Sequence, residues 1–110
     1  MEVLQMIELT KENFEDEVLQ AKGYVLVDFW GDACEPCKAL MPDIVSLEES
    51  YGEKIKFAKL NTSKARRVAI SQRVLGLPTI LIYKDGQIVE EITKDHANKN
   101  NIEAAINKHV

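Results

Sequence analysis

The sequence has few cysteines, few aromatic residues and no long hydrophobic run. Each of these features excludes a class of protein. Its 110 residues include two cysteines, and a hydrophobic fraction of 45% is enough for a core without disulfide support. Aromatic residues make up 6%, and 14 basic against 18 acidic residues give a net charge of −4, which argues against nucleic-acid binding. The apolar runs Tyr24–Val27 and Ile80–Tyr83 are broken by Asp28 and Lys84, so no membrane span is expected.

Further absences concern localisation and cofactors. Glu2 lies where a secretory signal carries basic residues, and no uninterrupted apolar region follows, so a cytoplasmic protein is expected. There is no glycine-rich phosphate loop, so we expect no bound nucleotide. The one basic cluster, Lys64, Arg66 and Arg67, is interpreted as a solvated helix end. The length predicts a single domain over residues 1–110.

Hydrophobic patterns predict alternating strands and helices. Tyr24–Trp30 is a continuous apolar run with one acid inside, typical of a strand buried on both faces. Asp85 and Gly86 lie between two strand-like runs and predict a hairpin. The expected strands are Val3–Leu9, Tyr24–Trp30, Ile55–Asn61, Thr79–Lys84 and Gln87–Ile92, and the expected helices run from Thr10 to Ala21, Cys34 to Tyr51, Thr62 or Ser63 to near Arg73, and Asn98 to His109.

This order of elements predicts an α/β fold. The β-α-β units imply parallel strands joined by right-handed crossovers, and the hairpin adds an antiparallel edge. The result is a central mixed β-sheet flanked by helices on both faces. Thr10 is expected to cap the first helix, and Pro42 should remove one hydrogen bond from the second helix and kink it.

The two cysteines, Cys34 and Cys37, are separated by two residues and admit four interpretations: a structural staple, a metal site, two inert core thiols or a redox pair. A loop this short constrains the unfolded chain very little, which argues against a staple. A zinc site needs at least three protein ligands, and the chain has only two cysteines. The two histidines, His96 and His109, are remote from the cysteines in the sequence, and we interpret them as surface residues without a role. No metal site is expected, and a CxxC pair near a β-α-β pattern is typical of thioredoxin-like redox motifs.

The position of the pair also favours redox chemistry. Cys34 falls near a predicted helix N-terminus, where free N–H groups and the helix dipole favour a thiolate. Pro36 in the first turn has no N–H to lose. Cys34 is therefore the expected nucleophile and Cys37, one turn inward, the resolving thiol.

With these residues in view, the chain resembles the thioredoxin family over essentially its full length. The resemblance is carried by VLVDFWGDACEPCK, FAKLN and GLPTILIYKDG in the expected order. It implies a thioredoxin fold and a reversible Cys34–Cys37 dithiol–disulfide couple, whose dithiol form reduces disulfides in partner proteins. A separate thioredoxin reductase-type enzyme would supply the electrons, with no cofactor bound, and a monomer is the expected state.

The resemblance assigns further roles residue by residue. Asp28 matches the buried acid that exchanges a proton with Cys37, and Lys59 matches the lysine that tunes that acid. Trp30 would cover the disulfide. Leu77 precedes Pro78, which matches a cis proline beside the disulfide. Gly86 matches the hairpin glycine.

Three residues depart from the family pattern. Ala33 replaces an aromatic residue, Glu35 replaces the glycine of the usual spacer, and Lys94 lies where the family has a glycine at the edge of the substrate groove. Ala33, Glu35 and Lys94 are therefore predicted to influence partner choice, and Pro36, in the spacer, is predicted to tune the redox properties of the pair. The charge of Glu35 should oppose a Cys34 thiolate and make the couple more reducing.

Three functions compete at this stage. The favoured one is a cytoplasmic protein-disulfide reductase. A disulfide oxidase or isomerase would normally be exported, and no signal is present. A non-catalytic thioredoxin-like adaptor would have no physical need for Asp28 inside a buried strand.

Overall fold

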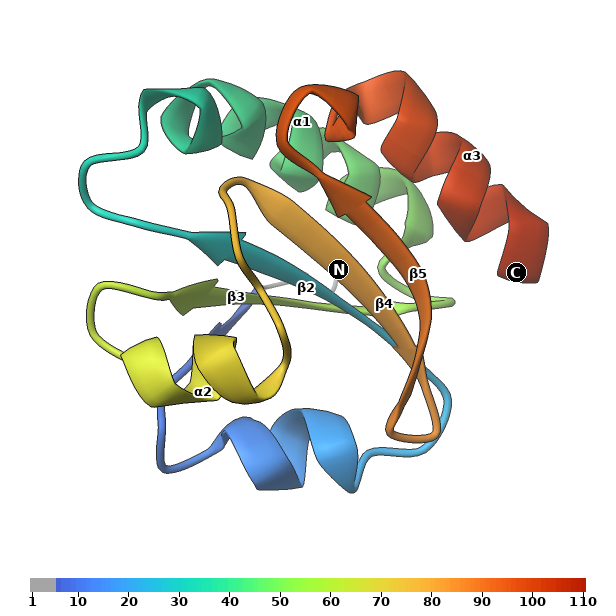
Figure 1. Cartoon of the computed structure of the whole chain (residues 1–110). Coiled ribbons are helices and arrows are strands. Elements are labelled where there is room, and N and C mark those ends of the chain that lie inside the picture. The colour runs from blue at the N-terminus through green and yellow to red at the C-terminus, as the bar shows by residue number, and fades with distance from the viewer. Residues whose placement is uncertain (1–5) are drawn as a thin grey trace.

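The structure, a computed structural model that describes residues 6–110, is built on a five-stranded mixed sheet (Figure 1). Expected strand residues 3–5 lie outside the described part. The strands are β1 (Ile7–Leu9), β2 (Tyr24–Trp30), β3 (Lys56–Asn61), β4 (Thr79–Lys84) and β5 (Gln87–Thr93). The helical segments are η1 (Glu15–Leu19), α1 (Glu35–Tyr51), α2 (Arg66–Ser71), η2 (Lys94–His96) and α3 (Lys99–His109).

The sheet has the order β1-β3-β2-β4-β5 and places β2 at its centre. β3 runs parallel to both β1 and β2, whereas β4 is antiparallel to β2 and β5. A central strand covered on both faces explains the continuous apolar run of β2. The predicted α/β class and mixed sheet are confirmed.

Helices cover both faces of the sheet, with α1 and α3 on one face and η1 and α2 on the other (Figure 1). Side chains alternate along β2, so Leu26 joins the core under α1 and α3, while Val25 and Val27 join the core toward η1. The same alternation places Asp28 on the α1 face. The carboxyl end of β2 leads into the loop that carries the cysteines.

Helix α1 follows the sequence prediction closely. Cys34 is its N-cap, with extended backbone angles, and Glu35 is its first residue. Pro42 lies inside the helix, which nevertheless continues to Tyr51. The missing N–H of Pro42 is therefore tolerated within a helix whose apolar face packs against the sheet.

The first and third helical segments differ from the prediction. Thr10 does cap its turn, because its Oγ1 accepts the N–H groups of Glu12 and Asn13 at 3.2 Å. The regular part that follows is a five-residue π-helix, η1, rather than an α-helix reaching Ala21. The prediction that Thr62 or Ser63 opens the next helix is wrong, because α2 begins at Arg66 without a side-chain cap.

The hairpin and the C-terminal helix complete the sheet. Asp85 and Gly86 both have positive φ, as the predicted two-residue turn requires, and a β-carbon on Gly86 would collide with the Leu19 carbonyl. His96 is exposed, as expected. His109 is half-buried and its Nε2 lies 2.7 Å from Oε2 of Glu90, so its interpretation as a surface residue without a role is wrong: the helix end docks it onto β5.

Candidate active site

The two cysteines form a disulfide at the start of α1, with their Cα atoms 5.3 Å apart. Cys34 is half-buried, whereas Cys37 is 1% exposed. Sγ of Cys34 accepts the backbone N–H of Cys37 at 3.1 Å, which places the outer sulfur at the helix N-terminus. Backbone donors and the helix dipole both stabilise negative charge at this sulfur. The outer cysteine is therefore the one that can meet another molecule.

Asp28 lies two residues before the end of β2 and is fully buried. Neither carboxylate oxygen has a hydrogen-bond partner. Burial raises the pKa of Asp28 to about 7, and the positive charge of Lys59 lowers it in part. A carboxyl group with this pKa exchanges a proton readily near neutral pH.

Lys59 is the β3 partner of Asp28 in the parallel register, and it is half-buried. Asp28 and Lys59 both face α1, because Phe57, two residues before Lys59 on β3, packs in the core under α1. The effect of Lys59 on the pKa of Asp28 is electrostatic, since no hydrogen bond joins the two side chains in the described structure. The structure therefore places Lys59 beside Asp28, and its tuning of this acid stays a prediction.

The loop before β4 contains the predicted cis peptide bond between Leu77 and Pro78. Pro78 is buried and Leu77 is half-buried. The backbone N–H of Lys94 donates to the Pro78 carbonyl at 2.7 Å, and Oγ1 of Thr79 lies 2.6 Å from the Gly76 carbonyl. The first bond fixes the backbone of Lys94 beside the proline loop, and the second ties the loop to the start of β4.

Trp30 ends β2 and is half-buried. Its carbonyl accepts both the backbone N–H of Thr62, at 2.7 Å, and the Thr62 hydroxyl, at 2.8 Å. Its indole Nε1 is buried and has no hydrogen-bond partner. Backbone contacts thus hold the end of β2 in place. That the Trp30 side chain covers the disulfide stays a prediction.

Glu35 and Pro36 occupy the first turn of α1 and are both exposed. Oε1 of Glu35 lies 3.4 Å from Nζ of Lys38, and the two side chains are 83% and 57% exposed. An ion pair this exposed is screened by water and salt. The charge of Glu35 is therefore partly balanced within the same helix turn.

Sequence reasoning missed a group of polar residues that fastens the redox loop. Asn61 is buried, and its Nδ2 donates to Oδ1 of Asp32 at 2.9 Å. Oδ1 of Asn61 accepts the Ser63 N–H at 2.9 Å, and the Ser63 hydroxyl accepts the Asp32 N–H at 3.1 Å. Polar residues after adjacent parallel strands meet at one sheet edge, a signal that could have identified them.

Within residues 6–110 we also looked for a metal site and for a membrane-spanning helix, and found neither. Within residues 6–110, no group of three or more His, Cys, Asp or Glu side chains is placed to share a metal ion. Among the helices of this part, none combines the length and the apolar character that crossing a membrane requires.

Comparisons with known proteins agree with this geometry. The thioredoxin family model matches residues 5–108. The thioredoxin of Acetoanaerobium sticklandii is 61% identical over 105 residues, which cover 96% of this chain and all of that protein. The thioredoxin of Peptoclostridium acidaminophilum is 59% identical over 105 residues, 96% of each chain, and one from Buchnera aphidicola (Schizaphis graminum) is 41% identical over 77% of this chain and 79% of its own.

This chain belongs to the thioredoxin family. Its fold is the thioredoxin fold, and it is a thiol–disulfide oxidoreductase. Family membership also implies disulfide-containing target proteins and a separate reductase as electron donor. The family resemblance identified from the sequence is confirmed, and the adaptor alternative is not needed.

Proposed function

We propose that the chain is a protein-disulfide reductase in which Cys34 is the nucleophile and Cys37 the resolving thiol. The observation that carries the proposal is the contrast between the two sulfurs: Cys34 is half-buried at a helix N-terminus, and Cys37 is 1% exposed. An attacking thiolate must reach a target, whereas a resolving thiol needs to reach only its neighbour.

The reaction then has two exchange steps. The Cys34 thiolate attacks a target disulfide, forms a mixed disulfide and releases one target thiol. Cys37 loses its proton and attacks Sγ of Cys34, which releases the second target thiol and closes the Cys34–Cys37 disulfide. Two electrons and two protons pass to the target, and a separate reductase returns them to the cysteines without a cofactor bound to this chain.

Asp28 is proposed to accept the proton of Cys37, directly or through water, and Lys59 to tune its pKa. The raised pKa of Asp28, about 7, and the burial of its unpartnered carboxylate support this role. Trp30, Glu35, Leu77, Pro78 and Lys94 are proposed to contact the target, and Pro36 to shape the spacer. We further propose a cytoplasmic, monomeric carrier formed by one domain.

The direction of electron flow is tested by the midpoint potential of the Cys34–Cys37 couple. The protein is equilibrated in dithiol–disulfide buffers, and Trp30 fluorescence reports the oxidised fraction. A value near or below about −270 mV supports a reductant. A value between about −180 and −120 mV is typical of oxidising relatives and would contradict the proposal.

A further inference from the structure

The charges of this acidic protein are divided unevenly along the chain. Residues 54–84 contain no aspartate or glutamate but eight of the 14 lysines and arginines. The remaining residues carry all 18 acids and six basic residues, so they are strongly negative. The basic segment comprises β3, α2, the cis-proline loop and β4, and it therefore forms one side of the active site.

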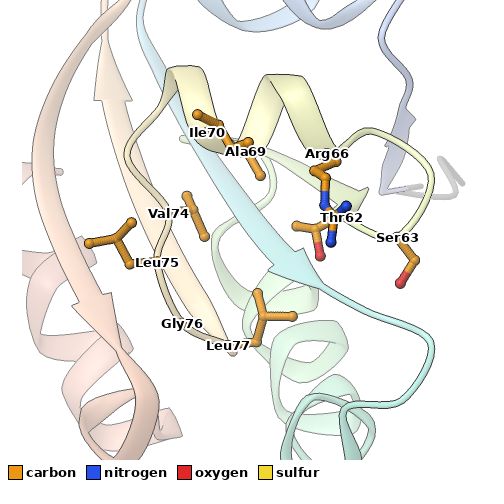
Figure 2. A pocket seen from close by; sticks show the side chains of 9 residues that line it. All are labelled: Thr62, Ser63, Arg66, Ala69, Ile70, Val74, Leu75, Gly76 and Leu77. Atoms are coloured by element: carbon orange, nitrogen blue, oxygen red, sulfur yellow. The ribbon is translucent and has the colours of Figure 1, made fainter.

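A groove of about 570 Å³ lies within this segment, between α2 and the loop that leads to Pro78 (Figure 2). Its apolar lining includes Ile70, which is 64% exposed, and Leu75, which is 94% exposed. The groove reaches the redox loop, because Leu77 and Thr62 line it and a β-carbon on Gly31 would lie 3.0 Å and 3.4 Å from their side chains.

Cationic side chains border the groove. Arg66 lines it from the first turn of α2, with its side chain extending beside Thr62 (Figure 2). Lys94 lies against Gly76, another lining residue, so closely that a β-carbon on this glycine would collide with the lysine. Arg73 immediately precedes the lining residues of the loop. We call Arg66, Arg73 and Lys94 the cationic rim.

Two members of the rim have a positive φ angle, which is unfavourable for residues that carry a side chain. Three non-glycine residues have positive φ in the described chain, and Asp85 is in a hairpin turn, where an aspartate is common. The other two are Arg73, with φ 61°, and Lys94, with φ 56°. Glycine would occupy either position without strain. Arg73 is the left-handed residue that closes α2, because its N–H and that of Val74 donate to the Ile70 and Ala69 carbonyls at 3.0 Å. Lys94 does not close a helix, so its left-handed backbone beside the groove indicates a role for its side chain.

The rim charges are not neutralised within the described structure. Across residues 6–110, none of the three side chains forms an ion pair within 4.0 Å, and Asp95 does not pair with the neighbouring Lys94. Glu35, the acid beside Cys34, is already paired with Lys38. The groove therefore presents unpaired positive charge and exposed apolar surface beside Gly31, at the start of the redox loop.

We propose that this groove selects target segments that carry acidic residues next to the reactive cysteine. The proposal rests on the proposed reductase function and names its substrate class: an extended, acidic segment of a disulfide-bearing protein. The rim attracts its carboxylates, and Ile70 and Leu75 contact its apolar side chains. Charge complementarity of this kind acts mainly on the rate of encounter and on the choice of partner.

The test compares three short synthetic peptides with one internal disulfide each, identical except for glutamate, glutamine or lysine on both sides of one cysteine. Pre-reduced protein is mixed with each peptide, and the rate of peptide thiol release is measured at about 0.01 M and about 1 M salt. We expect the glutamate peptide to react about tenfold faster than the lysine peptide at low salt, with most of this preference lost at high salt.

Two double variants locate the effect. Arg66→Gln with Lys94→Gln should reduce the glutamate-over-lysine preference to about twofold at low salt. Lys22→Gln with Lys54→Gln removes the same charge from exposed residues near the start of β2 and should keep the wild-type preference. The ratio of rates is the readout, so a general loss of activity does not imitate the result.

Equal rates for the three peptides at low salt would overturn the inference and leave the reductase function intact. A preference that survives in the Arg66→Gln, Lys94→Gln protein, or that falls equally in the control protein, would also overturn it. Failure to reduce any peptide, the neutral one included, would count against the proposed function itself.

Discussion

The end of β2 near the disulfide leaves a buried carboxylate unpaired, whereas the contact between α3 and β5 pairs a half-buried one. Of the buried side-chain atoms in the described structure, those without a hydrogen-bond partner are both carboxylate oxygens of Asp28 and Nε1 of Trp30. At the other site, Oε2 of Glu90 lies 2.7 Å from Nε2 of His109 and 3.3 Å from Nζ of Lys108. The Glu90 carboxylate is paired where α3 docks, whereas the Asp28 carboxylate, on the strand that leads to the cysteines, is unpaired.

This difference separates stability from reactivity. A paired carboxylate has a lowered pKa, as Glu90 does through its hydrogen bond with His109, and contributes to folding at neutral pH. An unpaired buried carboxylate has a raised pKa, as Asp28 does, and its ionisation opposes folding. The proposed transfer of the Cys37 proton to Asp28 gives a reason for this cost. Variants of Asp28 should therefore change reactivity as well as stability, whereas variants of Glu90 should change stability alone.

The largest effect is expected from the cysteines. Cys34→Ser should lower disulfide turnover by at least about a thousandfold, because the nucleophile is lost. Cys37→Ser should still attack targets but accumulate a mixed disulfide on Cys34, which intact mass measurement detects. If Cys37→Ser turned over normally without that adduct, the assignment of attacking and resolving thiols would be wrong.

Asp28→Asn should raise stability in alkaline solution and slow the reaction. The folded pKa of about 7 exceeds the unfolded value of 3.8, so wild-type stability falls as pH rises between these values. Above pH 7 the full penalty is present, and the neutral variant should be more stable by up to about 4 kcal/mol. Denaturant unfolding of the oxidised proteins at pH 5 and pH 8 measures this.

The pH dependence distinguishes an electrostatic from a packing effect of Asp28→Asn. A stabilisation equal at pH 5 and pH 8 would contradict the raised pKa, because pH 5 lies between the unfolded and folded pKa values and only part of the penalty is present there. The same variant should flatten the dependence of turnover on pH near 7, which a purely structural role would leave unchanged.

Glu90→Gln should act on stability alone. The lowered pKa of Glu90 means that its contribution is present above the unfolded pKa and is lost as pH falls through the folded pKa. We expect a loss of about 1 kcal/mol at pH 7 and a smaller difference in acid, measured by denaturant unfolding. A change in the midpoint potential of the cysteine pair would undermine the separation of the two sites.

The sequence predicts the elements that packing governs and misses those that polar contacts decide. The apolar run of β2 and the caps of α1 and α3 specify their elements locally, so their bounds agree with the structure within a residue. Thr62 and Ser63 have the residue types of a helix cap, yet they bind Trp30 and Asp32 across the sheet edge. Local propensity cannot reveal which of two partners a hydroxyl takes.

In the candidate site, too, local features are predicted and contacts between distant segments are not. The spacing of Cys34 and Cys37 predicts a disulfide, and the position of Asp28 inside an apolar run predicts its burial. The docking of His109 on Glu90 and the placement of Lys94 against Gly76 depend on segments far apart in the chain. Such contacts follow from tertiary packing, for which a single sequence carries no periodic signal.

Glu35→Gln should have the smallest effect, because it changes a charge at the site without changing any buried group. Removing the negative charge beside Cys34 should lower the pKa of its thiol, stabilise the reduced form and make the potential less negative. Glu35 is 83% exposed and lies 3.4 Å from Lys38, so screening should limit the shift in potential to about 10 mV.

Equilibration in dithiol buffers measures this shift, with Lys22→Gln as a distant control for a charge change. A shift toward more negative potential would reverse the predicted sign and show that the Glu35–Lys38 pair, rather than the carboxylate alone, sets the field at the sulfur.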